Sequence, residues 1–123
     1  MTGARRPRAL PASERLRRAT EFQAVFHQGK RIERPAFIAL WHATPGARKV
    51  GFTVTRRVRG AVHRNRVRRR LREVYRLQEG ALPEGLSVVF VGRESAEAAP
   101  LAALATEMGA AIATISQRAE AGR

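Results

Sequence analysis

Arginine is concentrated in one short stretch of this sequence, HRNRVRRRLREVYR, which runs from His63 to Arg76. The planar guanidinium group presents its N–H donors as a fork that fits a phosphate group, and it also stacks on bases. The stretch contains no lysine and a single acid, Glu73, whereas a solvated helix face normally mixes both signs of charge. The chemistry that these side chains offer is therefore the binding of a polyanion.

Two other polar residues of the stretch have a more specific geometry. Asn65 stands between two arginines, and an uncharged amide contributes hydrogen bonds of defined direction rather than charge. We expect it either to contact RNA or to act as a local cap. Glu73 lies four residues after Arg69 and three before Arg76, and this spacing predicts that it holds their side chains in a fixed array.

The apolar residues of the same stretch predict a docked helix rather than a disordered tail. Val67, Leu71 and Val74 recur at helical spacing within Ala61–Gln78 and form one stripe, with Tyr75 at its edge. The arginines occupy the adjoining arc. Arg57, which precedes this helix, continues the same positive surface.

Aromatic residues in an earlier segment offer a second kind of contact. Phe22, Val25 and Phe26 share one face of a predicted helix that ends at Gly29. The two phenylalanines either pack in the core or are partly exposed and stack on bases.

The overall composition favours a nucleic-acid partner. The formal net charge is +14, from 24 Lys and Arg against 10 Glu with no Asp, and such an excess attracts a phosphate backbone or an anionic membrane. No apolar stretch approaches the roughly 20 residues of a membrane span. The absence of cysteine excludes disulfides and thiolate metal sites and fits a cytoplasmic protein.

The acidic residues do not suggest a hydrolytic metal site within the protein. Catalytic metals in nucleases are held by clustered carboxylates, but the glutamates are scattered along the chain. His27, His42 and His63 could form an acid–base pair only if two of them converged, and they belong to three different predicted elements.

The remaining patterns predict an α+β fold in which one sheet is covered by helices. A capping-box spacing at Thr20 starts the first helix. Short, alternating or continuous apolar runs then predict strands, and Leu101 to Ile115 predict a C-terminal amphipathic helix. The predicted strands span residues 31–33, 37–42, 50–55 and 86–92.

Three further expectations concern connections and ends. Pro45 and Gly46 suit a type II turn and predict a hairpin between the second and third strands. If the strands on either side of the arginine-rich helix are parallel, the general rule predicts a right-handed crossover. Residues 1–12 are expected to be a disordered basic tail, residues 13–118 a domain, and residues 119–123 a flexible end.

Several of these segments together resemble the protein component of bacterial ribonuclease P, the ribonucleoprotein that removes the 5′ leader from precursor tRNA. AVHRNRVRRRLREVYR resembles the arginine-asparagine-arginine signature of that family. EFQAVFHQGKR resembles its first helix, KVGFTVTRRV the strand before the signature, and LSVVFVGRESA the strand after it. The resemblance covers roughly residues 14 to 97 in the family's order.

The resemblance implies a single domain with a four-stranded, mainly antiparallel sheet in the order α-β-β-β-α-β-α, and it implies a left-handed crossover. It also implies that a large RNA holds Mg²⁺ and performs the hydrolysis, that the protein has no catalytic residues and binds no metal, and that one protein monomer binds each RNA. Phe22 and Phe26 are implied to line the cleft for the single-stranded leader, near Trp41 and His42. The residues implied to face the catalytic RNA are Arg57, Arg64, Asn65, Arg66, Arg68, Arg69 and Arg72.

Two other functions remain open at this point. An RNA-binding module of another ribonucleoprotein, such as the ribosome, could use the same basic helix without affecting tRNA processing. An amphipathic helix on an anionic membrane is the weaker alternative, because the apolar stripe lacks Trp and Phe and is needed by the sheet.

Overall fold

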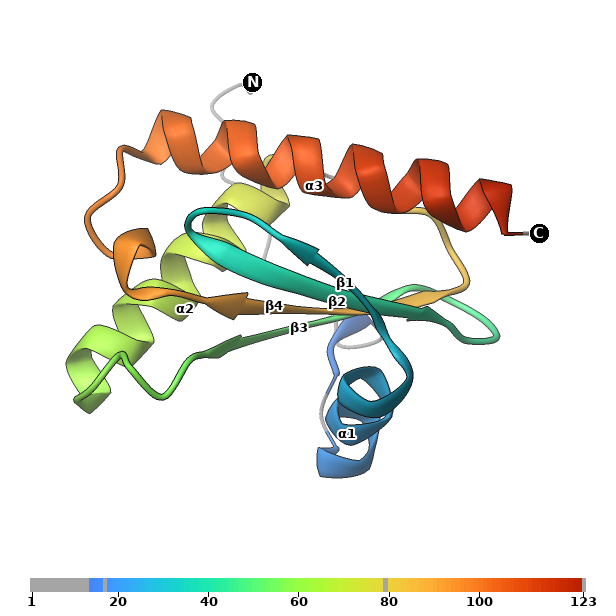
Figure 1. Ribbon diagram of the computed structural model, residues 1–123, viewed down its shortest axis with the longest axis horizontal. Helices are drawn as coiled ribbons and strands as arrows, with labels where there is room; N and C mark the ends of the chain where they lie inside the picture. The colour runs from blue at the N-terminus through green and yellow to red at the C-terminus, as the bar shows by residue number, and fades with distance from the viewer. Residues whose placement is uncertain (1–13, 17, 79, 123) are drawn as a thin grey trace, which may run out of the picture.

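A four-stranded sheet forms the centre of the computed structural model, which describes residues 14–16, 18–78 and 80–122 (Figure 1). The order of the main helices and strands is α-β-β-β-α-β-α, as predicted. In chain order the elements are α1 (Ala19–Gln28), β1 (Lys30–Glu33), β2 (Phe37–Ala43), β3 (Lys49–Val54), α2 (Ala61–Arg76), β4 (Leu86–Gly92), the short 3₁₀ helix η2 (Glu94–Ala96) and α3 (Leu101–Ala121).

The sheet is mixed, with the strands in the order β1, β2, β4, β3. β2 pairs antiparallel with β1 and β4, while β3 and β4 run parallel. The predicted hairpin between β2 and β3 is therefore wrong, because β4 lies between them and pairs with both. The turn residue itself is suited to its position, since Gly46 has a φ of 91°. Its carbonyl accepts the N–H of Gly85 at 2.9 Å, so this turn holds the entry to β4.

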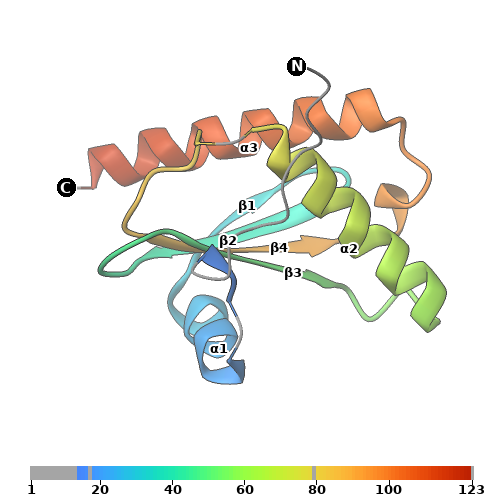
Figure 2. The ribbon, with the colours of Figure 1, turned by 180° about the vertical axis from the view of Figure 1, so that it is seen from behind.

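The core lies mainly on one face of the sheet, under α2 and α3, while α1 packs on the opposite face (Figures 1 and 2). Phe37 and Phe90 meet edge to face in this core, with ring centroids 5.7 Å apart. A smaller cluster under α1 contains Val25, Leu40 and Val89. The continuous apolar run of β4 is explained by this arrangement, because its side chains are buried on both faces.

The crossover from β3 through α2 to β4 is left-handed. In Figure 1 both strands run towards the left, α2 returns towards the right on the upper face, and β3 lies behind β4, as the reverse view in Figure 2 shows. The expectation from the general rule is therefore wrong here. The handedness implied by the family resemblance is the one observed.

Local backbone contacts fix the limits of α1. The helix begins after Arg18, whose N–H donates to Glu21 Oε1 at 3.1 Å, so the capping contact lies two residues before the predicted position at Thr20. It ends at Gly29, as predicted. A Cβ atom at Gly29 would lie 2.3 Å from the carbonyl oxygen of Val25 and 3.2 Å from the backbone of Trp41. Glycine therefore lets the chain turn from α1 directly into β1 beside β2.

The C-terminal helix is longer than its apolar pattern indicates. α3 continues to Ala121, and Ala119 packs against the main core, so the helix includes the first residues of the segment 119–123. The predicted tail, residues 1–12, lies outside the described residues. Among the described helices, none is long and apolar enough to cross a membrane.

Candidate RNA interface

The arginine-rich helix α2 is docked on the sheet by the predicted stripe. Val67, Leu71 and Val74 are fully buried, and Tyr75 is nearly so. The helix crosses the end of β4 at Gly92, where a Cβ atom would lie 2.3 Å from Val67 Cγ1. Glycine at this position therefore permits the close contact that holds α2 in place, with its arginine-bearing faces outwards.

Arg64 fastens the first turn of α2 to the end of β3. Its Nη1 donates to the carbonyl oxygens of Thr55 and Val58 at 2.9 Å, and its Nη2 donates to that of Val54 at 3.3 Å. Three of the five N–H donors of a guanidinium are thereby used within the protein. The role that these contacts support is structural, which differs from the RNA-facing position implied by the family resemblance.

Two other arginines tie α2 to the segment that follows β4. Arg66 Nη1 donates to Glu97 Oε2 at 2.8 Å, and His63 Nδ1 lies 2.6 Å from the same oxygen. The hydrogen bond with His63 is the main reason that the pKa of Glu97 lies below its usual range. Arg70 donates to the carbonyl oxygens of Ala96 and Ala99. These contacts were not visible in the sequence, because residues 96–99 are far from α2 along the chain.

The outward arginines differ from this group. Arg68 Nη2 donates to Asn65 Oδ1 at 2.5 Å, so the amide of Asn65 orients a guanidinium. The side chains of Arg57 and Arg69 are exposed, and within the described part of the chain they make no hydrogen bond or ion pair. The predicted array around Glu73 is wrong, since no ion pair of the described residues joins it to Arg69 or Arg76.

A pocket of about 330 Å³ lies beside the C-terminal half of α2, at the edge of the sheet formed by β3. The guanidinium of Arg72 lies 5.7 Å from the ring centre of Phe52, and Arg76 and Arg15 also line this pocket. Burial and the neighbouring arginines Arg76, Arg15 and Arg68 lower the pKa of Arg72. Positive charge held so closely favours an anion between these side chains.

Two of these pocket residues, Arg15 and Arg76, were not among the residues implied to face the RNA. Arg76 follows Arg72 at four-residue spacing, so the helical pattern could have identified it. Arg15 reaches the pocket because Leu16 N–H donates to the carbonyl of Val50 at 3.1 Å, which adds this segment to the edge of β3. That pairing leaves no local signal in the sequence.

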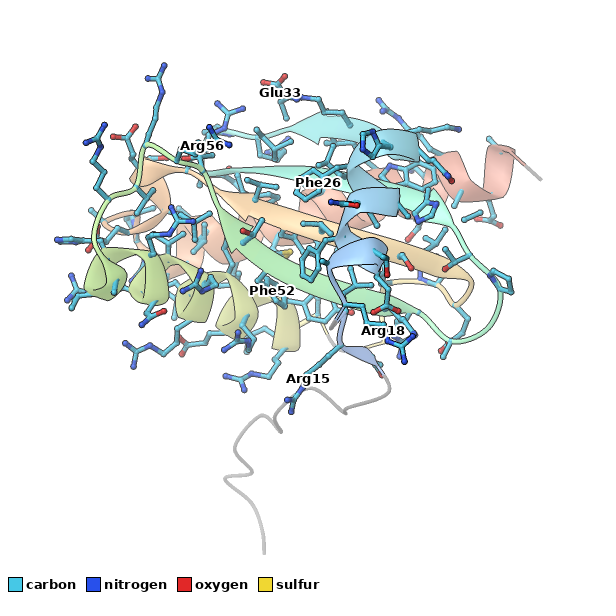
Figure 3. All side chains as sticks on the ribbon, turned by 90° about the horizontal axis from the view of Figure 1, so that it is seen from below. Arg15, Arg18, Phe26, Glu33, Phe52 and Arg56 are labelled. Atoms are coloured by element: carbon cyan, nitrogen blue, oxygen red, sulfur yellow. The ribbon has the colours of Figure 1, made fainter. Side chains whose placement is uncertain are left out.

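The two phenylalanines of α1 have different environments. Phe22 lies against β3 at Gly51, where a Cβ atom would be 2.7 Å from the ring, and it also lines the pocket. Phe26 is 48% exposed, and Figure 3 shows it on α1 above the sheet. Phe22 therefore combines both roles considered above, partial packing and an accessible ring, whereas Phe26 is mainly on the surface.

α1 covers only part of its face of the sheet (Figure 3). Beyond the helix, Ile38, Val91 and Thr53 lie side by side on three neighbouring strands, and each is only partly buried. Arg56 lies at the far end of this face (Figure 3). The result is a partly apolar surface with aromatic and basic residues at its borders, which we call the aromatic surface: Phe22, Phe26, Ile38, Val91, Thr53 and Arg56.

The other candidate residues lie elsewhere. Trp41 is 3% exposed and belongs to the core under α2 and α3, so it does not face the aromatic surface. His27, His42 and His63 lie on α1, β2 and α2. Among the described residues, no group of three or more His, Cys, Asp or Glu side chains is arranged to hold a metal ion.

Comparison with known proteins places this geometry in a family. Residues 10–116 match the family model described as Ribonuclease P. The chain is 36% identical over 113 residues to the ribonuclease P protein component of Acidothermus cellulolyticus, covering 88% of this chain and 92% of the relative. It is 42% identical over 95 residues to that of Desulfovibrio desulfuricans, covering 75% and 73%.

Solved structures agree with this result. The RNase P protein of Thermotoga maritima superposes with a TM-score of 0.70 at 26% identity, covering 80% of this chain and 94% of the other. That of Staphylococcus aureus superposes with a TM-score of 0.69 at 16% identity, covering 84% and 94%, and shares the fold. The chain therefore belongs to the Ribonuclease P family, whose members are the protein components of a ribonucleoprotein enzyme.

Proposed function

We propose that this protein binds the catalytic RNA of ribonuclease P and the 5′ leader of precursor tRNA, and so assists the cut that generates the mature 5′ end. The observation that carries the proposal is the way in which α2 docks on the sheet. Its apolar stripe is fully buried, so the helix is rigidly docked, and Arg57, Arg68 and Arg69 are left on the outside.

The outward arginines suit structured RNA. Side chains cannot reach the base edges in the deep, narrow major groove of A-form RNA, so proteins contact its backbone and shape. Docking fixes the spacing of the guanidinium groups, and the contacts of Arg64 and Arg70 with backbone carbonyls keep the helix in register with the sheet. We assign the catalytic RNA to this surface.

The aromatic surface suits the leader, which is single-stranded. Unpaired bases stack on aromatic rings, while basic residues follow the phosphates. Phe26 offers an exposed ring, and Phe22 belongs both to this surface and to the lining of the pocket that contains Arg72 and Arg76. The two surfaces therefore adjoin along β3, so one protein can contact both RNAs.

In this proposal the hydrolysis belongs to the RNA, which is expected to hold the Mg²⁺ ions. The protein acts as a monomer, one copy per RNA, in the cytoplasm. Its contribution is to hold the leader next to the catalytic RNA and to neutralise phosphates that would otherwise repel one another.

Reconstitution tests the proposal. The protein is added to a bacterial ribonuclease P RNA at low Mg²⁺ concentration, and 5′ maturation of a precursor tRNA is measured. We expect the protein to stimulate cleavage at the mature 5′ end. RNA binding without stimulation would contradict the proposal and support a role in another ribonucleoprotein such as the ribosome.

A further inference from the structure

A second pocket, of about 390 Å³, lies at the other end of the sheet between β2 and the C-terminal end of α3. Figure 1 shows that this end of α3 and the N-terminal end of α2 lie at opposite ends of the molecule. The volume is in the range of sites for small ligands or single nucleotide groups. No residue of the arginine-rich helix lines it.

The polar side chains around this pocket can all donate hydrogen bonds. They are Gln28, Lys30, His42 and Arg118, together with the indole of Trp41, and among the described residues no acidic side chain lines the pocket. Lys30 pairs with Trp41 across β1 and β2, and its ammonium group lies 5.2 Å from the centre of the indole ring. This contact holds one positive charge at the pocket wall.

The indole supplies an independent observation. Trp41 is 3% exposed, and its Nε1 is buried without a hydrogen-bond partner among the described residues. Buried N–H groups are nearly always satisfied, and an exception indicates a missing acceptor or a functional role. Trp41 also lines the pocket, so a bound ligand with acceptor oxygens is a candidate for that acceptor.

The local electrostatics also favour an anion. The C-terminal end of α3 carries a partial negative charge of about half an elementary charge. Lys30 and Arg118 carry two full positive charges, so the pocket remains positive. Its inner wall includes the buried side chain of Leu86. An apolar wall lowers the local dielectric constant and so strengthens the attraction of Lys30 and Arg118 for a bound anion.

We propose that this pocket binds a phosphate group of RNA at a site separate from the arginine-rich helix and the aromatic surface. The proposal rests on the proposed function only for the source of the phosphate, which is either the catalytic RNA or precursor tRNA. A contact at this end extends the RNA-binding surface along the length of the molecule and adds a point that fixes its orientation.

Trp41 is the only tryptophan in the sequence, so its fluorescence reports directly on the pocket. Inorganic phosphate is titrated into the full-length protein against chloride at matched ionic strength. We expect a saturable change in Trp41 emission with phosphate alone. Arg118→Gln should weaken phosphate binding about tenfold, Arg118→Lys should restore most of it, and Arg31→Gln, which removes a charge elsewhere, should have no effect. A non-saturable change, or equal affinity in Arg118→Gln, would overturn the proposal.

Competition then identifies the source. Ribonuclease P RNA and leader-bearing precursor tRNA are each added before phosphate, and the RNA that occupies the pocket should abolish the phosphate-induced change. If neither RNA does so, the assignment to RNA is overturned and the pocket binds only small anions. Cleavage by the wild-type holoenzyme is measured in parallel. If the protein does not stimulate cleavage, the proposed function is wrong, whereas phosphate binding in the pocket is still tested by the fluorescence titration.

Discussion

The arginines of α2 divide into two groups at the scale of single residues. Arg64, Arg66 and Arg70 donate hydrogen bonds to oxygen atoms of the protein and hold the helix in place. Arg69 makes no such contact in the described part of the chain, and Arg68 is oriented by Asn65. The same residue type therefore serves both to build the surface and to present charge from it.

This division predicts opposite results for two alanine variants. Arg64→Ala should lower the free energy of unfolding by about 2 kcal/mol, because hydrogen bonds from a charged donor to three carbonyls are lost. Arg69→Ala should leave stability unchanged within about 0.5 kcal/mol and should reduce the salt dependence of RNA binding by about one log unit per log unit of salt.

Chemical denaturation and RNA titrations at several salt concentrations measure these effects. Arg31→Ala is the matched control for Arg69→Ala, since it removes an exposed arginine on β1. If Arg64→Ala had the same free energy of unfolding as Arg69→Ala, the assignment of a structural role to Arg64 would be wrong.

Tyr75 provides a prediction about pH. Burial raises the pKa of Tyr75 to about 12, whereas a tyrosine in the unfolded chain ionises near 10. Between these values the unfolded chain loses the phenolic proton and the folded protein keeps it. The free energy of unfolding should therefore fall as pH rises from about 10 to 12, by roughly 2–3 kcal/mol in total.

Tyr75 is the only tyrosine, so the absorbance of the phenolate follows it directly. Denaturation of the wild type and of Tyr75→Phe is compared across the same pH range, and the variant should show a shallower decline. Ionisation of the folded wild type near pH 10 would contradict the prediction.

The sequence predicts residue roles only where they depend on local spacing. The stripe of Val67, Leu71 and Val74 follows from helical periodicity and is confirmed. The partners of Arg66 and Arg70 are not predictable in this way, because residues 96–99 approach α2 only after β4 has joined the sheet. The predicted array around Glu73 is wrong because the sequence spacing only permits its ion pairs with Arg69 and Arg76. Spacing alone does not determine whether these ion pairs form.

At the scale of elements, the contact between α1 and β3 depends on a missing side chain. Phe22 lies over Gly51 with no space for a Cβ atom, which would be 2.7 Å from the ring. The same ring lines the pocket at Arg72, so it lies where the aromatic surface meets that pocket beside the edge strand β3.

Gly51→Ala should therefore displace Phe22 and lower the free energy of unfolding by about 1–3 kcal/mol, and it should weaken binding of leader-bearing RNA. Gly109→Ala in α3 is the matched control. Its nearest neighbours, the side-chain atoms of Gln78, would lie 3.4–3.6 Å from the new Cβ, and alanine is favoured over glycine within a helix by about 1 kcal/mol. Thermal melting of both variants should show opposite shifts. A Gly51→Ala variant as stable as the wild type would contradict this account.

Elements were predictable from periodicity, but their pairing was not. The segments that form β2 and β3 are separated by a short turn, which made a hairpin the natural expectation. The strand that pairs with both, β4, comes after α2, and its insertion between them buries its fully apolar run on both faces. The left-handed crossover likewise followed from the family resemblance rather than from the general rule.

For the molecule as a whole, we expect the net charge of +14 to govern the proposed affinity for RNA. If about five phosphates are neutralised, the logarithm of the association constant should fall by about 3.5 to 4.5 per log unit of salt. Titrations of ribonuclease P RNA between low and physiological salt measure this slope. A nearly flat dependence would contradict binding through an arginine surface.

We propose that two adjoining surfaces of this one protein bind two different RNAs. The most direct test compares the affinities of the reconstituted holoenzyme for leader-bearing precursor tRNA and for mature tRNA, with wild-type protein and with Phe26→Ala. Phe26 is exposed, so its loss should not affect folding. We predict that Phe26→Ala reduces the preference for the leader-bearing RNA about tenfold and leaves the affinity for mature tRNA unchanged. An unchanged preference, or an equal loss of affinity for both RNAs, would contradict it.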